Sequence, residues 1–334
     1  MSDFYTHTGA RLPIIGGPMY PCSNLELVAA VSKAGGIGIV QPVSMTFVHK
    51  QDFREGLRAI RQITDAPIGM NALIEKSSKR YHEKMVSWVD IALEEGVRFF
   101  ITSLGNPAWV VKRVEEVGGV VYHDVTERKW ALKGLDAGAK GLIAVNNRAG
   151  GHAGSLSQEA LYAELKDLGV PLVCAGGIGD EMAFTQALGL GYAACQLGTR
   201  FIASEECNSS LVYKKAILAA DEKDVVLSEK ITGVPVSVIR TPYIERMGIQ
   251  AGPIARWLLQ GNRTKHWMRL FYTLRSAFRL RDASVNPPEE EATRQQEFWQ
   301  AGKSVAGINK IEPVAQIMGR FEATLERELN KGRK

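Results

Sequence analysis

A single histidine lies in a glycine-rich turn that directly follows an apolar run. The turn, residues 149–154, has the sequence AGGHAG with His152 in fourth place, and the apolar run is residues 142–145. Glycine lets backbone amides approach a ligand closely, and an imidazole exchanges a proton near neutral pH. The segment is therefore typical of a catalytic loop that handles a proton. From these residues alone, a capping or surface histidine is the alternative.

Two further glycine turns follow at similar intervals along the chain. Residues 174–179 have the sequence CAGGIG, and residues 196–200 have the sequence QLGTR. Backbone N–H groups in such turns, close to the start of a helix, bind phosphate groups. The three turns together predict a phosphate-containing ligand with a histidine beside it.

The elements that must position these turns alternate between short apolar runs and amphipathic stretches. We expect strands at residues 13–15, 37–40, 68–71, 99–102, 120–123, 142–145, 172–175 and 194–197. Helical patterns lie between them, such as residues 24–33, which begin at a Ser23-Asn24 cap and end at Gly35-Gly36. Eight such units predict an α/β fold, a TIM-type (β/α)8 barrel whose active site lies at the carboxyl ends of the strands.

An open, doubly wound sheet is the alternative fold. Such a sheet usually carries a GxGxxG fingerprint after its first strand, whereas the first expected strand here is followed by GGPM at residues 16–19. The strongest glycine turns follow the sixth, seventh and eighth expected strands instead. Because barrels commonly hold a cofactor phosphate in the loops after strands seven and eight, the pattern favours the barrel.

Composition and charge narrow the class of protein. The chain has 334 residues, 45% of them apolar and 23% charged, which is enough for one large domain with an insertion. It shows neither an apolar run of about 18 residues nor an N-terminal signal pattern, so we expect a cytoplasmic protein without a membrane segment. The four cysteines have no C-x-x-C spacing, and we expect reduced, buried thiols and no metal site.

The net charge of +5 is concentrated in residues 246–281, which contain eight Lys and Arg residues and no Asp or Glu. This uneven distribution argues against a nucleic-acid-binding protein. Apolar residues at helical spacing run through the same segment, namely Trp267, Leu270, Phe271, Leu274 and Phe278. The favoured interpretation is a lid helix packed on the barrel, and the alternative is a docking surface for an acidic partner or an anionic membrane.

Three regions follow from these patterns. Residues 1–219 form the expected barrel, and residues 220–311 interrupt its rhythm as an inserted, mainly helical substrate or lid subdomain. Residues 312–334 carry an amphipathic helix that is expected to return to the barrel.

Six segments resemble the nitronate monooxygenase family, formerly called 2-nitropropane dioxygenases. They are PIIGGPM at 13–19, AGGIG at 34–38, GMN at 69–71, the histidine turn at 149–154, AGGI at 175–178 and QLGTRF at 196–201. Enoyl-acyl carrier protein reductase II and flavin-dependent NADH:quinone reductases share nearly all of them. The resemblance implies a barrel that binds FMN.

The resemblance also implies roles for individual residues. Pro18, Met19 and Asn71 contact the isoalloxazine region, and Gly151 lines it. The ribityl phosphate is held by Gly176, Gly177, Gln196, Leu197, Gly198 and Thr199. His152 is the base that takes the proton α to a nitro group, or it holds a nitronate beside the flavin.

Two of these side chains have other interpretations from the residues alone. Asn71 is then better explained as a strand-end cap. His123, at the end of the fifth expected strand, either faces the flavin or makes a local hydrogen bond.

Two positions depart from the family pattern. Gly16 stands where the family usually has glutamine, and Asn147-Arg148 replaces the family's common residues before the histidine turn. An inward Arg148 would favour an anionic substrate, whereas an outward one is a solvated charge, and the outward orientation is slightly favoured.

The leading hypothesis is an FMN-dependent nitronate monooxygenase that oxidises alkyl nitronates or nitroalkanes with O2 to carbonyl compounds and nitrite. The alternative is an NAD(P)H-dependent flavin reductase that acts on a quinone or an enoyl thioester. A non-catalytic FMN-binding carrier or sensor is the third hypothesis, which a histidine turned away from the ligand would favour. The expected partners are a small-molecule substrate and O2, and a homodimer is left open.

Overall fold

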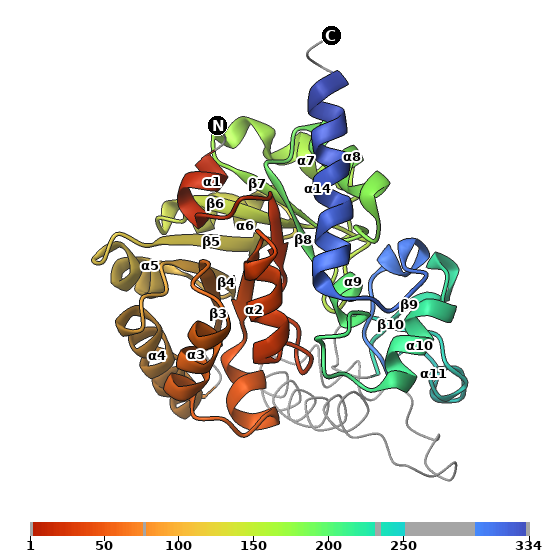
Figure 1. Ribbon diagram of the computed structural model, residues 1–334, viewed down its shortest axis with the longest axis horizontal. Coiled ribbons are helices and arrows are strands. Elements are labelled where there is room, and N and C mark those ends of the chain that lie inside the picture. The colour runs from red at the N-terminus through yellow and green to blue at the C-terminus, as the bar shows by residue number, and fades with distance from the viewer. Residues whose placement is uncertain (1–2, 76–77, 231–234, 251–297, 332–334) are drawn as a thin grey trace.

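The computed structural model describes residues 3–75, 78–230, 235–250 and 298–331. Eight parallel strands close into a barrel in chain order, and helices form a ring around it (Figure 1). The strands are β1 (Ile14–Gly16), β2 (Ile37–Val40), β3 (Ile68–Ile74), β4 (Phe99–Leu104), β5 (Val120–Val125), β6 (Gly141–Val145), β7 (Leu172–Ala175) and β8 (Ala194–Leu197). The predicted barrel is confirmed, and each expected strand overlaps an observed one.

The strands form a barrel because their side chains alternate between two buried faces. One set points into the barrel, including Ile15, Ile39, Ile101 and Ile143, and the other packs against the surrounding helices. Parallel strands that are covered on both faces are apolar along nearly their whole length. A polar side chain that faces inward on such a strand is therefore an exception to the apolar pattern of the barrel interior.

Helices connect the successive barrel strands, and two more, α9 and α10, follow β8. They are α2 (Leu25–Lys33), α3 (Phe53–Ile63), α4 (Lys79–Glu94), α5 (Ala108–Glu115), α6 (Arg128–Asp136), α7 (Gln158–Leu165), α8 (Glu181–Leu190), α9 (Thr199–Ile202) and α10 (Leu211–Ala219). Several begin at a side chain that accepts backbone N–H bonds, such as Asp52 before α3 and Asp180 before α8. Asn24 occupies the N-cap of α2 but bonds elsewhere, since its Nδ2 donates to Glu26 and to the carbonyl of Glu206.

Helix α1 (Asp3–Thr8) closes the amino-terminal end of the barrel. Phe4 is fully buried in the same cluster as the inward-facing strand residues, and Phe99 packs edge-on against Tyr122 at a centroid distance of 5.0 Å. The hydroxyl of Tyr122 is hydrogen-bonded to Nδ1 of His7 at 3.0 Å. This end is therefore filled and its polar atoms are paired.

Helix α14 (Val314–Lys331) lies beside α2 and α8 in the outer ring (Figure 1). Phe321 packs edge-on against Phe184 of α8, with ring centroids 5.1 Å apart. Arg320 donates to both carboxylate oxygens of the buried Glu312, at 2.6 Å each, and to Glu181. These contacts attach the C-terminal region to the barrel wall.

The described parts of residues 220–311 contain strands as well as helical turns. They comprise a 3-10 helix (Glu222–Asp224), the antiparallel pair β9 (Val225–Ser228) and β10 (Val236–Ile239), α11 (Pro242–Met247) and a second 3-10 helix (Lys303–Gly307). The expected lid helix with its stripe from Trp267 to Phe278 lies outside the described residues. Whether the whole region is mainly helical therefore stays a prediction.

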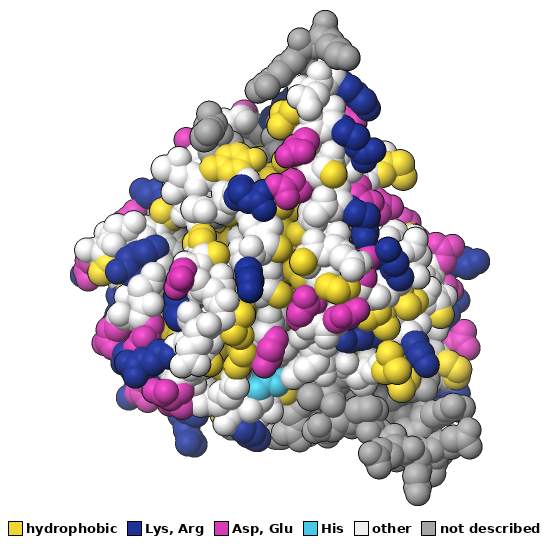
Figure 2. Space-filling model, viewed as in Figure 1, with side chains coloured by type: hydrophobic (Ala, Val, Ile, Leu, Met, Phe, Trp, Pro, Cys, Tyr) yellow, Lys and Arg dark blue, Asp and Glu magenta, His cyan; other side chains and the backbone are white. Residues whose placement is uncertain are grey.

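The visible surface carries charges of both signs, interspersed rather than gathered into one field (Figure 2). None of the helices in the described ranges is both long and apolar enough to cross a membrane. All four cysteines are buried and free, as expected.

Candidate active site

The carboxyl ends of the strands place three unpartnered oxygen atoms at the mouth of the barrel. Nine buried side-chain polar atoms lack a hydrogen-bond partner among the described residues, and they include Asn71 Oδ1 of β3, Asp124 Oδ1 of β5 and Gln196 Oε1 of β8. All three side chains face inward, because their neighbours in sequence pack outward against the helices. Since buried polar atoms are nearly always paired, this layer is suited to a ligand that supplies hydrogen-bond donors.

Asn71 lies within β3 rather than at its end. The strand continues to Ile74, which pairs with Leu104 of β4, and Asn71 itself is 6% exposed. A strand-end cap is therefore wrong as an explanation for this residue. Its position is that of a side chain directed at the interior of the mouth.

Strand β5 shows the alternation directly and adds a residue that the sequence analysis missed. Tyr122 points into the barrel, and His123 turns outward against Gly134 of α6, so Asp124 faces inward. Burial raises the pKa of the Asp124 carboxyl to about 7. The sequence did contain a sign of this role, because Asp124 follows directly after the expected fifth strand, residues 120–123.

His123 lies on the other side of this strand. Its Nδ1 is hydrogen-bonded to the hydroxyl of Thr102 at 2.9 Å, and burial lowers the pKa of the imidazole to about 4. The suggestion that His123 faces a flavin is therefore wrong, and the local hydrogen bond explains the residue.

The glycine turn after β7 is held by a buried asparagine that follows β6. Gly176 and Gly177 have φ angles of 120° and 84°, which L side chains rarely adopt. Asn146 is fully buried; its Nδ2 donates to the carbonyl of Gly176 at 3.0 Å, and its Oδ1 accepts from the N–H of Arg148 at 2.8 Å. Asn146 was also missed, because nothing in its own sequence context distinguishes it from an ordinary loop residue.

The turns after β1 and β8 meet at the same mouth. The N–H of Gly17 donates to the carbonyl of Leu197 at 2.9 Å, and Met19 lies against Gly198. Pro18 and Met19 are both half-buried. The side chain of Leu197 packs in the outer core, so only its backbone is available to a ligand.

At two glycines of the predicted site, a Cβ atom would meet its described neighbours only at ordinary van der Waals distances. A Cβ atom on Gly198 would come no closer than 3.6 Å to another atom, and one on Gly151 no closer than 3.9 Å. A Cβ on Gly176 would instead approach Asn146 Oδ1 to 2.4 Å. A Cβ would therefore cause no clash at Gly198 or Gly151, whereas Gly176 is required by the packing of the loops.

The histidine turn is fastened to the region after residue 220. The N–H of Ser237 in β10 donates to the carbonyl of Gly151 at 2.8 Å, and the N–H of Lys303 donates to the carbonyl of Arg148 at 2.9 Å. The N–H of Gly302 donates to Thr199 Oγ1 at 3.0 Å, which joins the same segment to α9. Ser237, Gly302 and Lys303, which lie in residues 220–311, therefore form part of the rim of the mouth.

His152 is exposed at this rim, and within the described residues its imidazole makes no hydrogen bond. Desolvation by the surrounding protein lowers its pKa below the usual 6.5. The ring is therefore neutral at neutral pH and available to accept a proton.

Arg148 is paired with a carboxylate and remains 36% exposed. Its guanidinium forms a bidentate ion pair with Glu222, with one contact of 3.2 Å, and its side chain lies over Gly177. The side chain is thus partly solvated, as expected, but its ion pair with Glu222 was not predicted. The pair connects the histidine turn, the turn after β7 and the 3-10 helix at residue 222.

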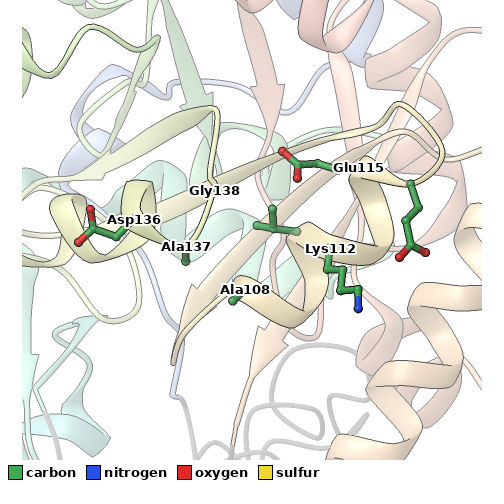
Figure 3. Close-up of a pocket in the computed structure, with 8 residues that line it drawn as sticks. Ala108, Lys112, Glu115, Asp136, Ala137 and Gly138 are labelled. Atoms are coloured by element: carbon green, nitrogen blue, oxygen red, sulfur yellow. The ribbon is translucent and has the colours of Figure 1, made fainter.

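A groove on the outside of the barrel is separate from this mouth (Figure 3). It is lined by Ala108, Val111, Lys112, Glu115, Glu116, Asp136, Ala137 and Gly138. These residues belong to α5, the end of α6 and the turns that follow them. None of the residues predicted for the site lines it.

With this geometry established, comparison with known proteins identifies the family. The sequence model of nitronate monooxygenase matches residues 4–321. The chain belongs to the nitronate monooxygenase family. Membership makes it a flavin-dependent oxidoreductase that acts on a small molecule.

The proteins that are similar to this chain are named for more than one activity. The chain is 27% identical over 252 residues to (3aS,4S,5R,7aS)-5-hydroxy-7a-methyl-1-oxo-octahydro-1H-indene-4-carboxyl-CoA dehydrogenase of Mycobacterium tuberculosis, covering 74% of this chain and 68% of that one. It is 26% identical over 296 residues to a probable nitronate monooxygenase of Staphylococcus saprophyticus, covering 76% and 82%. Among solved structures, FabK from Thermotoga maritima superposes with a TM-score of 0.79 at 28% identity, covering 100% of this chain and 98% of that one.

Proposed function

We propose that this member of the nitronate monooxygenase family is an FMN-dependent monooxygenase that converts alkyl nitronates or nitroalkanes and O2 to carbonyl compounds and nitrite. The observation that carries the proposal is the mouth of the barrel. There, inward-facing unpartnered oxygens meet glycine turns and a neutral histidine that has no partner among the described residues.

The residues present fit a flavin with a phosphate. The oxygens of Asn71 and Gln196 accept hydrogen bonds from the N–H groups of a flat ring, and Pro18 and Met19 offer an apolar edge. Gly198 carries no side chain that would obstruct a phosphate approaching backbone N–H groups near the turn after β7. When bound, FMN supplies the electron transfer, and the protein supplies position and proton handling.

His152 has the properties of the base in this proposal. A neutral imidazole accepts the proton α to a nitro group, and a lowered pKa keeps it neutral over the working range. For a nitronate, which has already lost this proton, the same ring donates a hydrogen bond to the anion. Contacts from Ser237 and Lys303 to the histidine turn support a role for the inserted region in enclosing the substrate.

A second function, reduction of an enoyl thioester or a quinone by NAD(P)H, is favoured by one observation. FabK from Thermotoga maritima is similar over the whole chain, and the relative from Mycobacterium tuberculosis is named for a CoA thioester substrate. The same mouth accommodates either reaction, because neither requires a different cofactor site.

Anaerobic flavin reduction separates the two functions. The purified protein is expected to contain FMN, identified by chromatography of the released cofactor, and to bleach with propionate 3-nitronate much faster than with NADH. Rapid bleaching by NADH without a response to nitronates would instead establish the reductase. Chromatography of the released cofactor also shows whether it is FMN or another flavin.

A further inference from the structure

Asp124 is a residue of the mouth to which the proposed reaction assigns no task. Its side chain leaves β5 toward the interior, one layer above Tyr122, and its Oδ1 is buried. It makes no hydrogen bond or ion pair with another described residue. A buried carboxyl without a partner is costly, and such groups collect at functional sites.

Within the part of the chain that the structure describes, the strands beside Asp124 present no charged side chain to it. The neighbouring strands present Ser103 of β4 and Ile143 and Val145 of β6 to the interior, and none of these side chains titrates. Helices α5 and α6 pack on the outer face of β5, behind the strand. Among the described residues, the titratable groups that we place at the rim are His152, Lys303 and the ion pair of Arg148 with Glu222.

Burial is the sole cause that raises the pKa of Asp124 to about 7, so the carboxyl keeps its proton up to neutral pH. A protonated carboxyl donates an O–H hydrogen bond, and a bond to an anionic oxygen is among the strongest in proteins. Once ionised, the same group repels an anion at close range.

We propose that Asp124 is a substrate-binding carboxyl group that donates a hydrogen bond to an oxygen of a planar oxyanion, such as a nitronate group. β5 neighbours β6, so Asp124 lies on the side of the mouth that carries the His152 turn. The inference rests on the proposed function for the class of ligand. According to this inference, Asp124 makes the site selective for an anionic group that contains several oxygen atoms.

Binding of nitrate, an inert planar oxyanion, tests this in the flavin-loaded enzyme. The dissociation constant, followed by the change in flavin absorbance, is expected to rise about tenfold per pH unit above about pH 7. His152 does not contribute there, because its lowered pKa leaves it neutral throughout. In Asp124→Asn, whose amide still donates but does not ionise, the constant is expected to stay within about twofold over the same range.

The matched control is Asp136→Asn, a carboxyl of the outer groove. It is expected to follow the wild-type pH dependence. The same pH dependence in Asp124→Asn and wild type would overturn the proposal. So would a constant that does not vary with pH in the wild type.

A second measurement requires no variant. The wild-type holoenzyme is expected to show the infrared C=O band of a protonated carboxylic acid at about pH 6, lost as the pH rises past about 8. Absence of such a band at the lower pH would also overturn the proposal. Neither readout needs nitronate turnover, so a protein that binds nitrate in this way but turns over no nitronate would refute the proposed function alone.

Discussion

The two ends of the barrel treat their buried polar groups in opposite ways. At the amino-terminal end, the hydroxyl of Tyr122 is bonded to His7, and Phe4 fills the remaining space. At the carboxyl-terminal end, the oxygens of Asn71 and Gln196 have no partner among the described residues. The same strands build both ends, so the difference arises from which inward-facing positions carry polar side chains, as Asn71 of β3 and Gln196 of β8 do.

Paired polar groups at one end stabilise the fold, whereas unpaired ones at the other end reduce stability and suit a binding site. A buried acceptor left unpaired costs about 1–3 kcal/mol, whereas a paired one contributes about 1 kcal/mol. Unpaired oxygens are therefore expected where a ligand supplies the missing donors. Four substitutions test the comparison, each with a matched control.

His152→Ala is expected to have the largest effect. Loss of a general base lowers turnover by about 10²- to 10⁴-fold, so turnover of a neutral nitroalkane should fall by this factor while bound flavin is retained. Turnover of a preformed nitronate should fall less, because that substrate has already lost its proton. Oxygen consumption with the two substrates measures both effects.

The control for this change is His82→Ala, which removes an exposed histidine of α4. It should leave both rates unchanged. An unchanged rate for the nitroalkane in His152→Ala would remove His152 as the base.

Gly176→Ala is expected to be nearly as damaging, through structure. The new Cβ would approach Asn146 Oδ1 to 2.4 Å and the backbone nitrogen of Ala149 to 2.6 Å, at a φ angle of 120°. The turns after β6 and β7 must then separate, so flavin content should fall below half and the free energy of unfolding by about 3 kcal/mol or more.

Gly169→Ala separates backbone strain from packing at the site. Gly169 also has a positive φ angle, 72°, but nothing lies within 4 Å of its Cβ position. It should cost about 1–2 kcal/mol and keep the flavin. Equal flavin loss in both variants, measured by absorbance per chain, would mean that the turn after β7 is not part of the cofactor site.

Gln196→Met is expected to weaken flavin binding without weakening the fold. It removes an unpaired oxygen from the empty protein and one hydrogen bond from the loaded one. The flavin dissociation constant should therefore rise about tenfold, while the unfolding free energy of the flavin-free protein stays equal or increases.

Gln41→Met is the matched control, because Gln41 lies at the end of β2 but is paired. Its Oε1 accepts from the N–H groups of Val43 and Ser44, at 2.7 and 3.1 Å. That variant should lose about 1–2 kcal/mol of stability in the flavin-free protein. A loss of similar size in Gln196→Met would contradict the contrast between paired and unpaired oxygens.

The sequence predicts the barrel well because strand periodicity and glycine turns are local signals. It predicts Gly176 and Gln196 for the same reason, with the family resemblance adding their roles. Asp124 and Asn146 could not be predicted in this way. The role of Asp124 depends on which way it faces on its strand, and that of Asn146 on a hydrogen bond between two loops. The pairing of Arg148 with Glu222 could not be predicted either, because it joins residues 74 positions apart.

Tyr122→Phe is expected to have the smallest effect and tests the closed end of the barrel. It removes the hydrogen bond to His7 Nδ1 and should lower the free energy of unfolding by about 0.5–1.5 kcal/mol. Flavin content and turnover should stay at the wild-type level, because the described residues at this end contain no buried side-chain N or O atom without a partner.

The control is Tyr81→Phe in α4, which removes a buried hydroxyl that has no partner among the described residues. That variant should be neutral or slightly stabilising in urea unfolding, and a cost as large as that of Tyr122→Phe would show that pairing does not distinguish the two hydroxyls.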